Sequence, residues 1–114
     1  GLKANGQLTL GENIADQGGL TIAYLALQMA NEGKQVPKID GFTPDQRFYI
    51  AYARLWGQNI TEAEIRRLTK LDPHSLGLLR VNQALRNIDP FYKAFNIRPK
   101  DKMYTAPKDR VVVW

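Results

Sequence analysis

The segment from about Leu10 to Asn31 limits what this chain can fold into more than any other part of the sequence. Its later half carries apolar residues on most sides of a helix: Leu20, Ile22, Ala23, Leu25, Ala26, Leu27, Met29 and Ala30. A helix that is hydrophobic all round is normally buried inside a larger body. We therefore expect one long helix here, with a surface that other parts of a protein cover.

Two carboxylates stand at the head of this segment. Glu12 and Asp16 are four residues apart, so they project from one face of a helix and can address a single point. Gly18 and Gly19 follow, and each costs roughly 1 kcal/mol in a helix relative to alanine. Such a pair is explained if another backbone or a crowded site lies close to the helix. A simpler alternative is a capping box formed by Thr9 and Glu12, which leaves Asp16 and both glycines unexplained.

The second helix has the clearest start in the sequence. Thr43 is a capping residue, Pro44 occupies the first helical position, and Gln46 completes a capping box. Apolar residues then recur every three or four positions until Gly57 breaks the helix. These residues are Phe48, Ala51, Tyr52, Leu55 and Trp56.

Two shorter helices follow. Thr61 and Glu64 predict a third helix with another capping box, and the proline after Asp72 ends that helix. Asp89 is expected to cap a short fourth helix. The rest of the chain is expected to be loop, except that the apolar end, Val111 to Trp114, should pack against the body.

The residues around the two carboxylates resemble a known motif. Glu12-Asn-Ile-Ala-Asp16 followed by Gly18-Gly19-Leu20 is similar to the signature of the neprilysin-like zinc metallopeptidases, the family of neprilysin and endothelin-converting enzyme. The resemblance implies that Glu12 is the third zinc ligand and that Asp16 orients a zinc-binding histidine. The other two ligands of that family come from an upstream H-E-x-x-H helix, a motif that this sequence does not contain.

The resemblance therefore implies a fragment. Residues 1–114 are expected to be the C-terminal piece of a thermolysin-like (gluzincin) catalytic domain, mainly α-helical, forming an irregular helical bundle with long loops. The parent enzyme would be a zinc endopeptidase that cleaves peptides on the amino side of hydrophobic residues with a zinc-activated water. Its partners would be the peptide substrate and the missing upstream part of the same protein. The fragment alone is expected to be inactive, to bind no catalytic zinc tightly, and to self-associate through uncovered apolar surface.

The only histidine lies in a second informative stretch, Asp72-Pro-His74-Ser. Family members carry Asp-x-His-Ser followed by Arg-Val-Asn at the spacing that separates His74 from Arg80. The resemblance implies that His74 stabilises the oxyanion of the tetrahedral intermediate, that Asp72 holds its tautomer, and that Arg80 binds the peptide backbone. Leu76 departs from the proline often found in this loop. A structural histidine and a salt-bridged structural arginine stay open as alternatives, and an offset of six does not put the two on one helix face.

Two further residues are assigned by the same resemblance. The counterparts of Leu55 and Trp56 border the S1′ pocket of the family, which implies a role in substrate binding. For Trp56, a place in the hydrophobic core is an equal alternative. Phe91-Tyr-Lys-Ala-Phe95, Met103-Tyr104 and the terminal Val-Trp also resemble the family, so the similarity spans essentially the whole chain.

Composition bears on the alternatives. Residues 86–114 hold seven of the sixteen Lys and Arg but only three Asp, within a net charge of +5. A basic helical module that binds nucleic acid or an anionic surface is therefore a second hypothesis. Because acids interrupt the basic run, we expect a solvated face and no nucleic-acid binding. A catalytically dead scaffold is a third hypothesis.

The compartment follows only from the resemblance. The sequence has no cysteine, which excludes disulfides and thiolate metal sites. Since vertebrate members of the family are disulfide-rich, this points to a bacterial member. The family implies an extracytoplasmic location (periplasmic, secreted or membrane-anchored), and a cytoplasmic one stays open.

Overall fold

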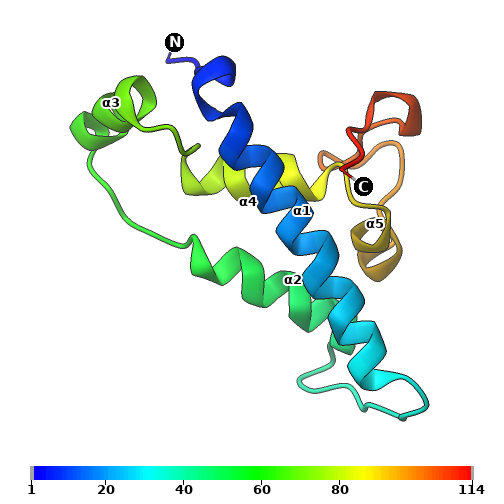
Figure 1. Ribbon diagram of the computed structural model, residues 1–114. Coiled ribbons are helices and arrows are strands. Elements are labelled where there is room, and N and C mark those ends of the chain that lie inside the picture. The colour runs from blue at the N-terminus through cyan, green and yellow to red at the C-terminus, as the bar shows by residue number, and fades with distance from the viewer. Residues whose placement is uncertain (1, 114) are drawn as a thin grey trace.

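The computed structural model describes residues 2–113, and within that range it is built from five α-helices and one 3₁₀ turn (Figure 1). The described residues form no β-strand, only an isolated bridge between Ile39 and Phe42. The mainly α-helical class expected from the sequence is confirmed. None of the helices in this range is long and apolar enough to cross a membrane. In chain order the elements are α1 (Gly6–Asn31), α2 (Pro44–Leu55), α3 (Glu62–Leu71), α4 (Gly77–Leu85), α5 (Asp89–Phe95) and η1 (Pro107–Asp109).

α1 begins one turn earlier than the sequence predicted, at Gly6. The side chain of Asn5 caps the helix by accepting a hydrogen bond from the backbone N–H of Leu8 at 3.1 Å. Thr9 lies inside the helix, where it is buried and its hydroxyl donates to the carbonyl of Asn5 at 3.0 Å. The capping box of Thr9 and Glu12 is therefore wrong. Asparagine caps helices more effectively than threonine, so the earlier start is favoured.

The predicted start of α2 is confirmed. The Thr43 side chain accepts from the backbone N–H of Gln46 at 3.2 Å, and the Gln46 side chain accepts from the backbone N–H of Thr43 at 2.9 Å. Gln46 also donates to the carbonyl of Ala94 at 2.9 Å, which ties α2 to α5. Between the two helices Tyr49 is 2% exposed, with its ring centroid 5.5 Å from that of Phe91. The first half of the aromatic face of α2 therefore lies in the hydrophobic core.

α3 starts and ends where the sequence predicted, but its capping box is only half formed. The Thr61 side chain accepts from the backbone N–H of Glu64 at 3.2 Å. The Glu64 carboxylate accepts two hydrogen bonds from Arg67 rather than returning to the cap. The helix stops at Asp72, whose extended backbone precedes a proline. Every residue of α3 is at least partly exposed, so the helix lies on the outside of the molecule.

α4 was not predicted, and the cap predicted for α5 is wrong. Leu76 precedes α4 without any side-chain hydrogen bond to the described residues, so the helix lacks the start signal that marks α2 and α3. Ile88 occupies the cap position of α5, and Asp89 is its first helical residue. The Asp89 carboxylate instead accepts from the guanidinium of Arg110 at 2.6 Å. The aspartate lies inside the helix, one residue past the cap position.

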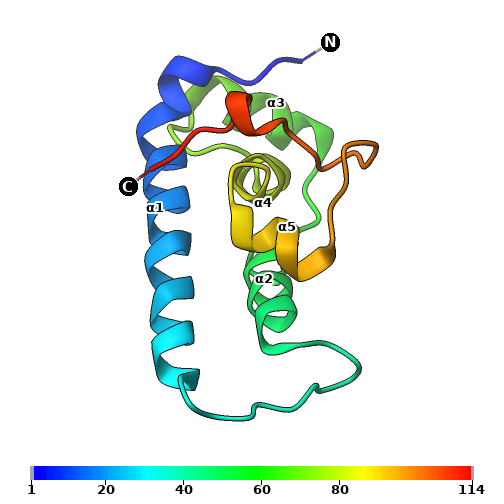
Figure 2. The same ribbon diagram turned by 90° about the vertical axis from the view of Figure 1, so that its right-hand side faces the viewer.

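Two helix pairs make up the body, because α1 packs against α4 and α2 packs against α5. Figure 2 shows α1 along one side, with the C-terminal segment crossing back towards it. There the carbonyl of Val111 accepts from Gln17 Nε2 at 2.6 Å, and the Val111 N–H donates to Asn87 Oδ1 at 2.9 Å. The apolar end is thus tied to the body through the backbone of Val111, but its side chains do not pack as expected, since Val111 and Val112 are 56% and 81% exposed. Trp114 lies outside the described residues.

One long face of α1 is uncovered. Ile22, Leu25 and Met29 are 56%, 56% and 75% exposed. Gly18 is buried, but a Cβ built on Gly19 would meet no atom of the described residues within 4 Å. Gly19 instead lines a cavity between α1 and α2, and the close approach expected at the glycine pair stays a prediction for contact with the upstream part of the protein.

Candidate functional site

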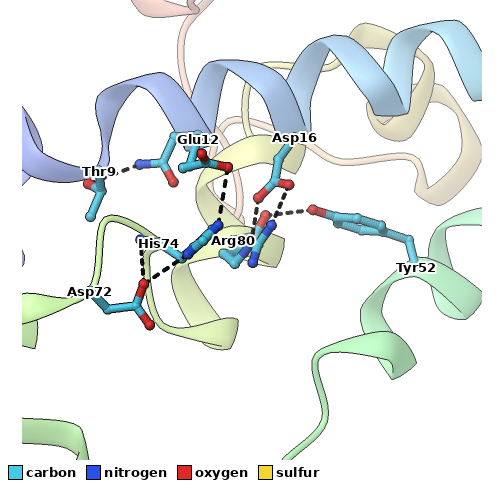
Figure 3. Close-up of polar contacts among 8 residues, drawn as sticks. Thr9, Glu12, Asp16, Tyr52, Asp72, His74 and Arg80 are labelled. Carbon is cyan, nitrogen blue, oxygen red and sulfur yellow. Dashed lines mark hydrogen bonds and ion pairs between the residues drawn. The ribbon is translucent and has the colours of Figure 1, made fainter. Parts of the chain in front are cut away.

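The acidic face of α1 meets the segment that leads into α4 (Figure 3). Glu12 Oε2 lies 3.2 Å from Nε2 of His74, and one helical turn further on Asp16 pairs with Arg80. The structure therefore brings together four residues that the sequence singled out from two distant stretches. The offset of six between His74 and Arg80 fits because His74 precedes α4 whereas Arg80 lies within it.

Asp72 holds His74 from the other side. Its Oδ1 lies 2.8 Å from His74 Nδ1 and also accepts the backbone N–H of His74 at 2.8 Å. These contacts hold the pKa of the Asp72 carboxyl below its usual value, and the backbone bond contributes most. An ionised carboxylate can only accept hydrogen bonds, so the contact keeps a proton on Nδ1 and leaves Nε2 facing Glu12.

Arg80 and Asp16 form a two-bond ion pair. Nε donates to Oδ2 at 2.6 Å and Nη2 donates to Oδ1 at 2.7 Å, while the two side chains are only 14% and 15% exposed. The hydrogen bonds to Asp16 raise the pKa of the guanidinium, although burial opposes that shift. This is the salt-bridged arrangement that the sequence left open for Arg80. Because a guanidinium has five N–H donors, the pair leaves donors for a further ligand.

The C-terminal end of α2 packs against Arg80. The guanidinium carbon lies 3.7 Å from the ring centroid of Trp56, which is a cation–π contact. The hydroxyl of Tyr52 donates to the backbone carbonyl of Arg80 at 3.1 Å. Tyr52 and Trp56 are four residues apart and therefore face the same side. Trp56 is half-buried and is not part of the hydrophobic core cluster of the described residues, so its contact with Arg80 is the role that the structure shows. Its place at the S1′ pocket stays a prediction.

Leu55 borders a neighbouring cavity. The cavity has a volume of about 450 Å³ and lies between α1 and α2, with Asp16 and Gly19 on one side and Tyr52 and Leu55 on the other. Leu55 is 76% exposed at its edge. The lining is mostly aliphatic and aromatic, so the cavity suits an apolar side chain next to the acidic face of α1.

Among the described residues, the side chains at this site do not form a metal site by themselves. Catalytic zinc sites need three protein ligands together with an open position. No group of three or more His, Cys, Asp or Glu side chains in residues 2–113 could hold a metal ion. The Asp16 carboxylate is held by Arg80, whereas the Glu12 side chain is 47% exposed and accessible. Glu12 is therefore the carboxylate of this site that could serve as a metal ligand, as the sequence predicted.

Two contributors to the site were missed at the level of sequence. Tyr52 was assigned only to an apolar stripe, and Gly77 was not singled out at all. The signal for α4 was present in the spacing of apolar and small residues three or four apart, but no capping residue marks where the helix starts. The members of that pattern are Gly77, Val81, Ala84, Leu85 and Ile88.

Comparison with known proteins decides the family. A model of peptidase family M13 matches residues 1–111. The chain belongs to peptidase family M13. It is 35% identical to a neutral endopeptidase of Lactococcus lactis over 111 residues, which are 97% of this chain and 16% of that protein. It is 36% identical to endothelin-converting enzyme 1 of Mus musculus over 117 residues, covering 100% of this chain and 15% of the relative. The resemblance to neprilysin-like peptidases is thereby confirmed.

A solved zinc metalloprotease structure has the same fold in this region. The chain superimposes on the Mycobacterium tuberculosis zinc metalloprotease Zmp1 in complex with an inhibitor with a TM-score of 0.96 at 41% identity. The match covers 99% of this chain and 17% of that one. The chain therefore spans about a sixth of the relatives that it matches.

Proposed function

We propose that this chain is the part of a zinc-dependent endopeptidase that supplies one zinc ligand and the oxyanion-stabilising histidine. The observation that carries the proposal is the convergence on one face of α1, where Glu12 meets His74 and Asp16 meets Arg80. Membership of family M13 and the similarity to a zinc metalloprotease support it.

Glu12 would hold the zinc, which when bound acidifies a water molecule and polarises the scissile carbonyl. Asp16 is suited to orient a zinc-binding histidine contributed by the rest of the protein. Its two oxygens each accept one bond from Arg80. An ionised carboxylate can accept about four hydrogen bonds, so the ion pair and a histidine N–H can be satisfied together.

His74 would donate to the oxygen of the carbonyl under attack. Asp72 holds the ring through Nδ1, so Nε2 is the atom that faces the site. In this role both ring nitrogens would carry a proton, so that Nδ1 donates to Asp72 while Nε2 donates to the carbonyl oxygen. A donor placed where negative charge develops stabilises the transition state more than the ground state. The half-exposed side chain, 42% accessible, can reach a bound peptide.

Arg80 and the cavity beside Leu55 would bind the substrate on the primed side. Two of the Arg80 nitrogens are occupied by Asp16, which leaves the donors of Nη1 for a peptide carbonyl. The apolar cavity between α1 and α2 favours a hydrophobic side chain after the cleaved bond. The substrate class is therefore peptides cut on the amino side of a hydrophobic residue.

The working enzyme would include the upstream part of the same protein, which supplies the two histidine ligands and covers the apolar face of α1. The family resemblance supports an extracytoplasmic location for it. Arg110 of the basic segment is used internally, in the ion pair with Asp89 and a stack on Tyr92, which counts against a role for this residue in a basic binding module.

The test is a zinc and activity measurement on the full-length enzyme. Glu12→Ala is expected to lose zinc and peptidase activity together, because a three-ligand site that loses one ligand binds the metal poorly. Glu32→Ala, at the far end of the same helix, is the matched control and should keep both. A Glu12→Ala enzyme that retains stoichiometric zinc would contradict the assignment. A full-length protein that has neither zinc nor peptidase activity would favour the dead scaffold.

A further inference from the structure

Gly77 lies against the backbone of Trp56. A Cβ built on this glycine would be 2.7 Å from the carbonyl oxygen of Trp56, 3.2 Å from its Cβ and 3.3 Å from the Gln58 side chain. The first of these distances is one that real Cβ atoms essentially never show. Gly77 is buried and is the first residue of α4, where any amino acid could adopt the backbone conformation. The glycine is therefore required for close approach and not for a special dihedral angle.

The same turn of α4 carries Arg80. Residues three apart on a helix share a face, so Gly77 and Arg80 both look towards the end of α2. Trp56 contacts both of them, with its backbone against Gly77 and its ring 3.7 Å from the Arg80 guanidinium carbon. Tyr52 adds a third contact through its hydrogen bond to the Arg80 carbonyl. The distance between α2 and α4 at this point thus sets where the guanidinium lies.

We propose that Gly77 and Tyr52 are positioning residues for Arg80. Their contacts hold the first turn of α4 against Trp56, and this keeps the guanidinium stacked on the ring while it pairs with Asp16. The inference rests on the proposed function of Arg80 in binding peptide substrate. Neither residue touches the reacting atoms, so both act on substrate binding through Arg80.

Replacing Gly77 by alanine is expected to displace α4 as a whole, because no side-chain rotation can relieve the clash. The clash is with a backbone carbonyl, which cannot rotate away as a flexible side chain does. The Cβ must move from 2.7 Å to at least the 3.4 Å at which ordinary contact begins, so α4 shifts by several tenths of an ångström away from Trp56. Arg80 moves with it and loses part of both the stack and the two-bond pair. Misplacement of a binding group by about 1 Å can cost up to 100-fold, so a smaller shift is expected to cost about tenfold.

The test is steady-state kinetics on the full-length, zinc-loaded enzyme with a peptide substrate. Gly77→Ala is expected to raise KM about tenfold and to leave kcat within about twofold, the pattern of lost uniform binding. Gly57→Ala is the matched control, because its Cβ would be 3.5 Å from the Arg54 carbonyl, an ordinary contact. It should leave both constants unchanged. Zinc content should equal that of the wild type in both variants, because Glu12 lies on α1.

A double-mutant cycle separates positioning from a general structural effect. If Gly77 acts through Arg80, the Gly77→Ala change should add little to the KM of an Arg80→Ala enzyme. Equal KM effects of Gly77→Ala in the presence and absence of the arginine would overturn the proposal, as would an unchanged KM in the single variant. If Arg80→Ala itself leaves KM unaltered, the proposed function of Arg80 fails instead.

If the Gly77→Ala enzyme does not fold, Tyr52→Phe provides a second test of the same proposal. It removes one hydroxyl and retains the ring, so the fold should persist while KM rises about two- to fivefold. A wild-type KM for Tyr52→Phe, in that case, would overturn the proposal.

Discussion

His74→Phe is the substitution that most directly tests how this site works. Phenylalanine keeps a planar ring of similar size in a loop position that is 42% exposed, so packing changes little. The backbone N–H of His74 continues to donate to Asp72, and this bond is the main cause of the lowered pKa of the Asp72 carboxyl. The loop should therefore keep its conformation, and the change removes only the ring nitrogens.

The expected magnitude follows from the number of donors lost. Nδ1 is committed to Asp72 at 2.8 Å, so Nε2 alone faces the site. Removing one donor to a developing oxyanion costs about 3–4 kcal/mol, which is roughly 100- to 1000-fold in rate. We expect kcat of the full-length enzyme to fall by that factor, with KM and zinc content nearly unchanged. Asp72→Asn should lie between the wild type and His74→Phe, because the ring remains but loses its charged partner.

The measurement combines kcat and KM for a peptide substrate with metal analysis of the same preparations. Retention of most of the wild-type kcat by His74→Phe would refute the oxyanion role. Loss of zinc by this variant would refute it as well, because it would make His74 a metal ligand. A thermal unfolding curve like that of the wild type is the control that the loop has not collapsed.

Three further predictions concern the chain of residues 1–114 expressed alone. Tyr49→Phe should raise the free energy of unfolding by about 1 kcal/mol, because its buried hydroxyl has no partner among the described residues. Tyr92→Phe should lower it by about 1–3 kcal/mol, because that hydroxyl accepts from Thr105 N–H at 2.7 Å. Denaturant titrations measure both values, and equal effects of the two substitutions would contradict this prediction. Burial, with help from the hydrogen bond to Asp45, raises the pKa of Tyr24 to about 12. Because this folded-state pKa lies above the unfolded value of 10.0, the protonated Tyr24 contributes to stability fully below pH 10, and the contribution is lost as the pH rises towards 12. An ultraviolet titration in which all tyrosines of the folded chain ionise near pH 10 would contradict this prediction. The uncovered face of α1 should bind a hydrophobic dye in the native state or cause self-association, and a monodisperse chain without dye binding would count against it.

Local features of this protein could be predicted from sequence. The start of α2 follows from Thr43, Pro44 and Gln46, because caps and proline act on the backbone beside them. The end of α3 at Asp72 follows in the same way. Glu12 and Asp16 share a face because the helical period alone determines it. Short-range errors arose where two local signals competed, as when Asn5 took the capping position that Thr9 was expected to hold.

Tertiary structure decided what those residues meet. Arg80 and Asp16 are 64 residues apart, and no local rule states that they pair in a two-bond contact at 2.6 and 2.7 Å. The pairing depends on α4, which has no capping side chain and forms because its apolar face packs against α1 and the core. Gly77 likewise carries no signal by itself, since its role appears only when the backbone of Trp56 lies against it. Helix period and caps are properties of neighbouring residues, whereas these contacts depend on the path of the whole chain, and only the folded molecule determines that path.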